Sequence, residues 1–157
     1  MSVPQRADMP TWECYDLLES SSVGRLCFLD GGTPITFPVC FKVHRTETAA
    51  YIVIRTGPQS LMAKYAGPAS FEVDDIDVET RTAWSVLLRG AVHRSFDTDH
   101  LPVPDPWITG DHHAWLLFQV DVLSGRRFVA RDATDGFSVE WHLDTTHERP
   151  DTKGRST

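Results

Sequence analysis

The chain has 157 residues, of which 41% are hydrophobic and 24% are charged, and its formal net charge is −7. This length fits one domain with its own core and is too short for two ordinary domains, and the hydrophobic content excludes a disordered chain. A net negative charge opposes tight binding to a phosphate backbone, which depends on many Lys and Arg residues. No nucleic-acid partner is therefore expected.

The sequence also excludes an ordinary membrane protein. It contains no apolar run approaching the roughly 20 residues that span a bilayer, and its first residues, MSVPQRADMPTW, lack the apolar segment of a signal peptide. We therefore expect a cytoplasmic protein that does not bind membranes. Cys14, Cys27 and Cys40 form no C-x-x-C pair, and zinc sites usually place two ligands in one short loop. Buried free thiols and no metal site are expected.

The first predicted elements are a helix and a hairpin. Thr11 is a plausible N-cap for a short helix over WECYDLLES, in which apolar residues recur at helical spacing. Two strands, VGRLCFLD and TPITFPVCFKVH, then flank Gly31 and Gly32, which can supply the positive φ angles of a tight turn. Pro38 cannot donate a ladder hydrogen bond, so its strand should run at an edge, at a bulge or beside a ligand.

Side chains of a strand alternate between its two faces. In the second strand this alternation predicts a core-facing set, namely Ile35, Phe37, Val39, Phe41 and Val43.

The remaining elements are mostly strands. A third strand is predicted in AAYIVIRT, followed by about two turns of helix in QSLMAKYAG, which Gly67-Pro68 should end. The fourth and fifth strands are ASFEVDD and WSVLLRGAVHRS. A proline-rich loop, PVPDPWITGDHH, then precedes the sixth strand, HAWLLFQVDVL, which leads through Ser124-Gly125 to RRFVAR. Gly90 within the fifth strand suggests a bend or bulge of the kind that closes barrels.

Many short strands with few helices predict a mainly β fold, either a barrel or a sandwich, and the mixture of core and amphipathic strands favours a closed sheet. We divide the chain into an N-terminal extension (1–10), the folded domain (11–141) and a tail (142–157). The tail, HLDTTHERPDTKGRST, has almost no apolar content and is predicted to be disordered.

One stretch, RTGPQSLMAK at residues 55–64, carries a pattern suited to a phosphate. A strand end with Arg55 and Thr56, a Gly-Pro turn, and a helix start with Ser60 and Lys64 bring a guanidinium, two hydroxyls and an ammonium to one place. Ser60 and Lys64, which are i,i+4 partners, should lie on one face of this helix, and the positive end of the helix dipole should face the same anion. The alternative from spacing alone is that Arg55 and Lys64 are solvated surface charges.

These features resemble the FMN-binding split-barrel proteins related to pyridoxamine 5'-phosphate oxidase, in particular the nitroimidazole-resistance-like branch. The motifs that carry this resemblance lie between about Cys14 and Phe128, and their order along the chain is informative. They are LLESSSVGRLCF, PITFPVCF, YIVIRTGPQSLMAK, FEVDDID followed by WSVLLRG, and DPWITG with SGRRF. The resemblance implies a six-stranded antiparallel split β-barrel with short helices, a homodimer, and FMN in a groove between the subunits.

The resemblance also implies cofactor-binding residues. The phosphate would be held by Arg55, Thr56, Ser60 and Lys64. The segment along the isoalloxazine ring would be Pro38, Val39, Cys40 and Phe41. Trp84 and Ser85 would either approach the flavin from the partner subunit or line the groove that holds it. Trp107 would cover the isoalloxazine ring.

Plainer roles remain open for several of these residues. Trp84 and Trp107 could instead pack within the protein, and Phe41 fits the barrel interior better than a ring contact. Arg126-Arg127 could instead be surface charges. The adjacent His112-His113 are interpreted as a surface pair, and the acidic turn around Asp74, Asp75, Asp77 and Glu79 as solvated. The short polar C-terminus lacks the extra basic residues that a full pyridoxamine-phosphate oxidase needs, so that reaction is not assigned.

Two functions follow from the resemblance. As an enzyme, the protein would pass electrons from NADH or NADPH to a small organic acceptor, with the chemistry supplied by FMN and no catalytic side chain required. As a binding module, it would carry FMN, or the deazaflavin F420 or haem, without turnover. F420 would call for a longer basic groove, and haem for an axial ligand such as His44 or His93.

Overall fold

The computed structural model describes residues 7–129. Its elements in chain order are β1 (Ala7–Asp8), α1 (Thr11–Ser20), β2 (Val23–Asp30), β3 (Thr33–Arg45), β4 (Ala50–Thr56), α2 (Leu61–Lys64), β5 (Gly67–Asp77), β6 (Thr82–Ser95) and β7 (Ala114–Val129). The β2–β3 turn uses Gly31 and Gly32 at φ values of 55° and 83°, as their sequence predicts.

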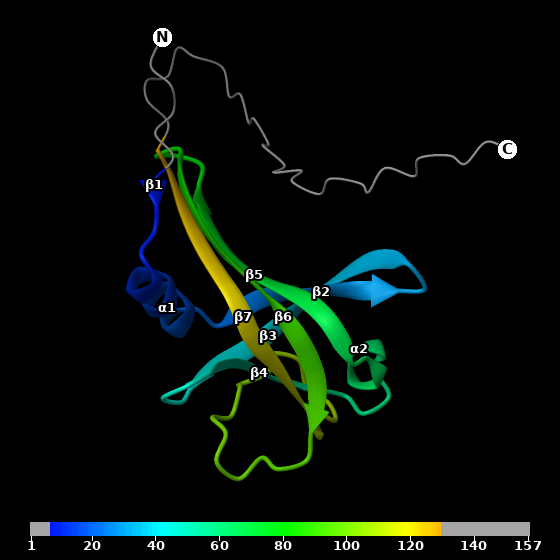
Figure 1. The fold of residues 1–157 in the computed structure, drawn as a ribbon. Helices are drawn as coiled ribbons and strands as arrows, with labels where there is room; N and C mark the ends of the chain where they lie inside the picture. The colour runs from blue at the N-terminus through cyan, green and yellow to red at the C-terminus, as the bar shows by residue number, and fades with distance from the viewer. Residues whose placement is uncertain (1–6, 130–157) are drawn as a thin grey trace, which may run out of the picture.

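The strands close into a ring. The sheet order is β1-β7-β4-β3-β2-β5-β6, and β6 also pairs with β7, so that six antiparallel strands form a barrel with β1 added at one edge (Figure 1). This confirms the predicted mainly β, six-stranded antiparallel barrel with short helices.

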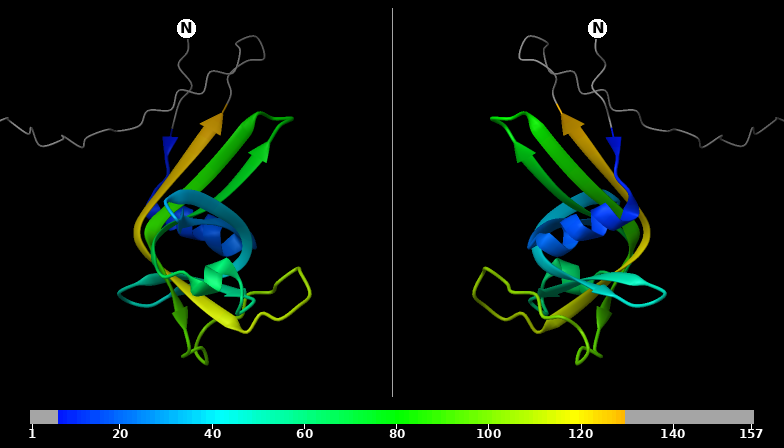
Figure 2. Two further views of the ribbon diagram at one scale, coloured as in Figure 1. Left: turned by 90° about the vertical axis from the view of Figure 1, so that its right-hand side faces the viewer. Right: turned by 90° about the vertical axis from the view of Figure 1, so that its left-hand side faces the viewer.

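Alternating residues of every barrel strand fill the interior. The largest fully buried side chains there are Leu26, Phe41, Ile52, Ile54, Phe71, Leu88, Leu116 and Phe118. The inward set predicted for β3 is confirmed, since Phe41 and Val39 are buried and Ile35, Phe37 and Val43 pack partly against this core. Helix α1 lies against β7 (Figure 2) and adds Cys14 and Leu18, both fully buried, to the same core.

A bulge at Gly90 bends the longest strands. The β6–β7 register shifts between Arg89 and Gly90, as predicted for this glycine. A Cβ atom at Gly90 would lie 1.8 Å from the Gln119 carbonyl oxygen, so only glycine fits there. Beyond the bulge, β5, β6 and β7 continue as an extension past the rest of the barrel, and β1 pairs with the edge of β7 there (Figure 1).

Three local predictions differ from the structure. The helix after β4 has one turn rather than two, because Tyr65 is already extended and Gly67-Pro68 begin β5 instead of ending the helix. Strand β7 runs unbroken through Ser124-Gly125, where Gly125 packs closely against Cys14 and Met9. The N-cap of α1 is Pro10 rather than Thr11, with no side-chain cap bond.

Within residues 7–129 there is no helix with the length and apolar character needed to cross a membrane. Residues 130–141 of the predicted domain and the predicted tail, 142–157, lie outside the described residues.

Candidate cofactor-binding site

The turn after β4 brings two hydroxyl groups together. Thr56 ends β4 with its side chain turned toward the interior and only 6% exposed, and its Oγ1 donates a hydrogen bond to Ser60 Oγ at 3.0 Å. Ser60 is the N-cap of α2, and its Oγ also accepts a hydrogen bond from Ala63 N at 3.1 Å. Since Ser60 Oγ accepts from both partners, its own proton remains to be donated to a ligand.

Arg55 lies next to Thr56 but faces the other side of β4, because neighbouring side chains alternate. Its Nε donates to the backbone carbonyl of His112 at 3.1 Å, and its guanidinium carbon lies 5.1 Å from the centre of the Trp115 ring. Among the described residues its two terminal nitrogens make no hydrogen bond. Arg55 is therefore not a freely solvated charge, and the edge of the guanidinium that suits an oxyanion is open.

Lys64 is the last residue of α2 and is exposed, with no hydrogen bond or ion pair within residues 7–129. The expected i,i+4 helical face shared with Ser60 is not formed as predicted, because Ser60 is extended and the helix is a single turn. So short a helix has little dipole of its own. The attraction for an anion at this turn therefore rests on the side chains of Arg55, Ser60 and Lys64.

The candidate ring-binding strand, β3, has a free edge beside this turn. Residues 33–40 pair with β2, with Pro38 opposite Arg25, whereas pairing with β4 begins only at Phe41. No described strand occupies the other edge at Pro38, as expected for a residue without an N–H. Val39 and Phe41 are 8% and 1% exposed, so only their backbone groups, with the side chains of Pro38 and Cys40, can face a ligand.

Aromatic contacts connect this strand to the phosphate segment. Tyr65, directly after α2, stacks on Phe28 of β2 with ring centroids 4.3 Å apart, and Phe28 stacks on Phe37 of β3 at 5.9 Å. These contacts join the residue that directly follows α2 to β3 at Phe37, next to Pro38, through the buried ring of Phe28.

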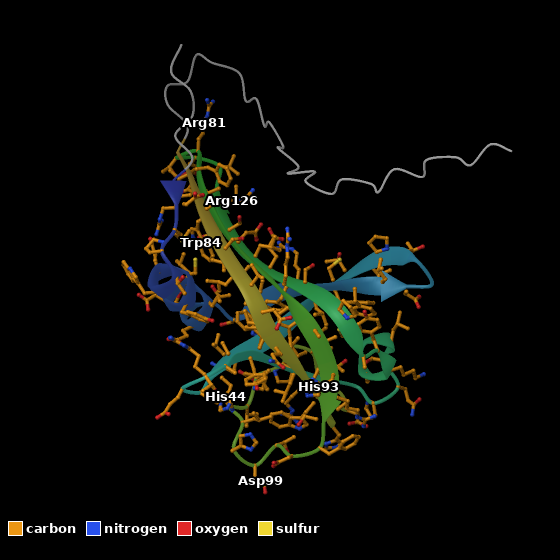
Figure 3. The ribbon with its side chains drawn as sticks, in the orientation of Figure 1. His44, Arg81, Trp84, His93, Asp99 and Arg126 are labelled. Carbon is orange, nitrogen blue, oxygen red and sulfur yellow. The ribbon has the colours of Figure 1, made fainter. Side chains whose placement is uncertain are left out.

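Trp84 and Ser85 lie elsewhere. Trp84 is on the extension near α1, at the opposite end of the barrel from α2 (Figures 1 and 3), and packs partly against the core. Together with Asp75 and Arg127, it lines a shallow hollow of about 240 Å³. The Nε of Arg127 donates a hydrogen bond to the Glu13 carboxylate at 3.0 Å. Ser85 and Arg126 pair on the opposite face of the extension. Within one chain, neither Trp84 nor Ser85 approaches the phosphate segment.

Trp107 lies in the loop 96–113 that joins β6 to β7, and this loop contains the predicted irregular segment 102–113. Its side chain is 73% exposed. The loop is nevertheless attached to the barrel: Leu101 is 7% exposed, and the His100 ring meets His44 of β3 with centroids 5.7 Å apart. At its far end the loop reaches Arg55 through the His112 carbonyl.

His112 and Trp115 are site residues that the sequence did not reveal. The interpretation of His112-His113 as a surface pair is wrong for His112, whose Nδ1 is buried, while the side chain of His113 is 84% exposed. A contact made through a backbone carbonyl leaves no signature in sequence. The pairing of Trp115 with Arg55 follows only from the β4–β7 register.

Other titratable groups serve the fold. Asp77 accepts hydrogen bonds from the backbone N–H groups of Glu79 and Thr80, which lower the pKa of its carboxyl and close the β5–β6 turn. Burial, with the nearby Glu13 carboxylate, raises the pKa of the Cys14 thiol. In the described part of the chain no three His, Cys, Asp or Glu side chains gather to hold a metal ion.

The closed six-stranded barrel with a free β3 edge beside a cationic turn defines the class as a split barrel. The family model for pyridoxamine 5'-phosphate oxidase matches residues 10–102, more than half of the chain. The protein therefore belongs to the pyridoxamine 5'-phosphate oxidase family. A search of curated protein sequences found no significant match.

Solved structures agree with this membership. A FAD binding protein from Mycobacterium smegmatis is 26% identical, with 79% of this chain and 99% of that chain covered and a TM-score of 0.60. A conserved protein of unknown function from Corynebacterium diphtheriae is 27% identical, with 79% and 98% covered and a TM-score of 0.66. A putative 5-nitroimidazole antibiotic resistance protein from Bacteroides thetaiotaomicron shares the fold at 12% identity, with 81% and 90% covered and a TM-score of 0.57.

Proposed function

We propose that this protein is a homodimeric flavoprotein that binds FMN and passes electrons from NADH or NADPH to a small organic acceptor. The observation that carries the proposal is the turn after β4, where Ser60 has a proton to donate and Arg55 presents open terminal nitrogens. Together with the exposed Lys64, these groups suit a terminal phosphate. Family membership and the FAD binding relative support a flavin as the ligand.

The free edge of β3 fits the ring of the same ligand. A flat polar heterocycle needs backbone donors and acceptors at its rim, and residues 33–40 leave such groups unpaired on one side. Bound flavin supplies the hydride and electron transfer itself, so the protein has to bind, orient and shield it. Pro38 and Cys40 would line the ring, and Trp107 would cover it.

The dimer is part of the proposal because one chain offers an incomplete site. Trp84 and Ser85 are too distant to meet a cofactor held by Lys64 of the same chain, so they would act on the partner's cofactor. A mixed dimer tests this: Lys64→Ala and Ser85→Trp homodimers should each bind FMN weakly, whereas a dimer with one protomer of each kind should regain one intact site. No regained binding in the mixed dimer contradicts a shared site.

The primary experiment is a flavin titration. Purified protein should bind FMN at one equivalent per subunit, seen as quenched flavin fluorescence and a shifted absorption band, and should bind riboflavin more weakly. FAD, F420 and haem are tested in parallel, FAD because the Mycobacterium smegmatis relative is a FAD binding protein. Failure of every flavin to bind would overturn the proposal, and preferential binding of F420 or haem would replace FMN with that cofactor.

Electron transfer is tested separately from binding. When NADH or NADPH is mixed anaerobically with the FMN-loaded protein, we expect the flavin absorbance to bleach, and a nitro or quinone compound to restore it. A flavin that binds tightly but is reduced by neither nucleotide would favour a carrier over an oxidoreductase. Oxidation of pyridoxamine 5'-phosphate is not part of the proposal.

A further inference from the structure

His112 is bonded on two sides at the junction of the loop 96–113 and β7. Its backbone oxygen accepts the hydrogen bond from Arg55 Nε at 3.1 Å. Its ring Nε2 lies 2.7 Å from the carbonyl oxygen of Ile108. A carbonyl only accepts, so Nε2 carries the proton and donates it. One residue thus connects the candidate phosphate segment to the part of the loop that bears Trp107.

The hydrogen bond to Ile108, rather than the second ring nitrogen, fixes the orientation of the His112 ring. Nδ1 is buried and has no hydrogen-bond partner within residues 7–129. Turning the ring over would move the protonated nitrogen away from Ile108 and break that bond. The imidazole therefore has one favoured orientation, and it acts as a rigid connection between Ile108 and its own backbone.

Contacts with the loop 96–113 and with β7 set the orientation of the Arg55 guanidinium. The His112 carbonyl holds the Nε side of the guanidinium, and the Trp115 ring lies 5.1 Å from its central carbon. A guanidinium is planar, so fixing one edge and one face fixes the direction of the remaining N–H groups. Those groups are then presented to an oxyanion without further ordering, which favours binding.

The loop also touches the phosphate turn directly. A Cβ atom placed on Gly57 would lie 3.2 Å from the Asp111 carbonyl oxygen, so the chain at Asp111 passes close over the turn that follows Arg55. Movement of the loop end and movement of the turn are therefore coupled by packing as well as by the Arg55 hydrogen bond.

We propose that His112 is a positioning residue that couples the loop 96–113 to the cofactor phosphate by holding Arg55 in its binding orientation. This inference rests on the proposed function. Coupling between two binding events is reciprocal, so an anchored loop strengthens phosphate binding, and bound phosphate stabilises the loop. The loop that carries Trp107 thereby responds to the cofactor's phosphate rather than only to its ring.

Variants at two adjacent histidines test the coupling. His112→Ala should weaken FMN binding by about 3- to 10-fold, the usual effect of one lost hydrogen bond. His112→Gln keeps an N–H where Nε2 stands and should restore affinity to within about twofold. His113→Ala is the matched control, because the His113 side chain is exposed and the one ion pair of its ring within residues 7–129 is with Asp111 at 3.5 Å. Thermal unfolding of each variant checks that all are folded.

Amide hydrogen exchange in the loop measures an effect that a purely structural role of His112 would not produce. In wild-type protein FMN should slow amide exchange in residues 103–112, and riboflavin, which has the ring but lacks the phosphate, should slow it clearly less. In His112→Ala the effect of FMN on the loop should fall to that of riboflavin, even at saturating FMN. In the apo protein, Arg55→Ala should speed exchange in the same residues.

The outcomes separate the inference from the proposed function. If no flavin binds to wild-type protein, both are overturned. If FMN binds but His112→Ala matches His113→Ala in affinity and in loop exchange, or if riboflavin slows the loop as much as FMN does, the coupling through His112 is wrong and the flavoprotein assignment stands.

Discussion

The hydroxyls of Thr56 and Ser60 are joined by a 3.0 Å hydrogen bond across the turn that follows β4. This bond is made between two side chains that are four residues apart, and it fixes the oxygen that also caps α2. The shape of the turn is therefore set by the protein's own groups, which lowers the entropic cost of binding.

Replacement of Ser60 should affect both stability and binding. Ser60→Ala removes an N-cap and should lower the free energy of unfolding by about 1 kcal/mol, and it should weaken FMN binding because the donated proton is lost. Ser60→Thr keeps the hydroxyl and should leave both within about 0.5 kcal/mol of wild type, since Thr caps nearly as well as Ser. Urea unfolding and FMN titration give the two values. Unchanged FMN affinity in Ser60→Ala would remove this hydroxyl from the site.

Removal of the Lys64 ammonium should weaken FMN binding strongly. Lys64→Ala deletes a charge-assisted hydrogen bond, so the loss is expected to be about 1.5–3 kcal/mol. The control is Arg81→Asn at the β5–β6 turn, at the far end of the extension from α2 (Figures 1 and 3), where asparagine tolerates the observed φ of 53°. Equal FMN affinity in the two variants would show that Lys64 is an ordinary surface charge.

Thiol labelling should report contact with β3. The expectation of buried thiols holds for Cys14, which is fully buried, and is wrong for Cys27 and Cys40, which lie on the barrel strands β2 and β3 and are both partly exposed. In the native protein N-ethylmaleimide should modify Cys40 and Cys27 and leave Cys14 unmodified, as followed by mass spectrometry. Saturating FMN should slow modification of Cys40 several-fold and leave Cys27 unaffected. Protection of neither thiol, or of both equally, would argue against a ring lying along residues 38–41.

The buried Cys14 thiol should make stability depend on alkaline pH. Burial raises its pKa, so the folded state binds the thiol proton more tightly than the unfolded state does. The resulting stabilisation is complete below about pH 8.5, the ordinary thiol pKa, and is lost as the pH rises toward the folded pKa. Urea unfolding between pH 7 and 10 should show a smaller decline for Cys14→Ala than for wild type. Parallel declines would contradict this.

The bulge in β6 should tolerate only glycine. Gly90→Ala would place a Cβ atom 1.8 Å from the Gln119 carbonyl oxygen, so we expect a loss of more than about 2 kcal/mol in the free energy of unfolding, as for other forced backbone clashes. Ser124→Ala on the exposed side of β7 is the control and should stay within about 0.5 kcal/mol of wild type. A stable Gly90→Ala protein would mean that the strand can bend there without glycine.

The sequence predicted the barrel because its signals are local. Alternation in residues 35–43, the Gly31-Gly32 turn and the glycine at position 90 each act on their immediate neighbours, and the structure confirms all three. The length of α2 could not be predicted in this way. Gly67 and Pro68 resemble a helix stop, yet both are used by β5, whose pairing with β6 is a tertiary effect.

The candidate site was only partly accessible from sequence. Arg55, Thr56, Ser60 and Lys64 lie within ten residues, so one local pattern revealed them. The connection of Arg55 to His112 spans 57 residues and runs through a backbone oxygen, which has no side-chain identity to read. The separation of Trp84 from this turn depends on the direction of the β5–β7 extension, and that direction follows from the closed sheet.

The most direct test of the account is the ratio of the FMN and riboflavin dissociation constants for the wild-type protein. These ligands share the ring and differ in the phosphate. If Arg55, Ser60 and Lys64 hold that phosphate, FMN should bind at least about 100-fold more tightly, equivalent to two charge-assisted hydrogen bonds. Equal affinities would contradict a phosphate site at the turn after β4.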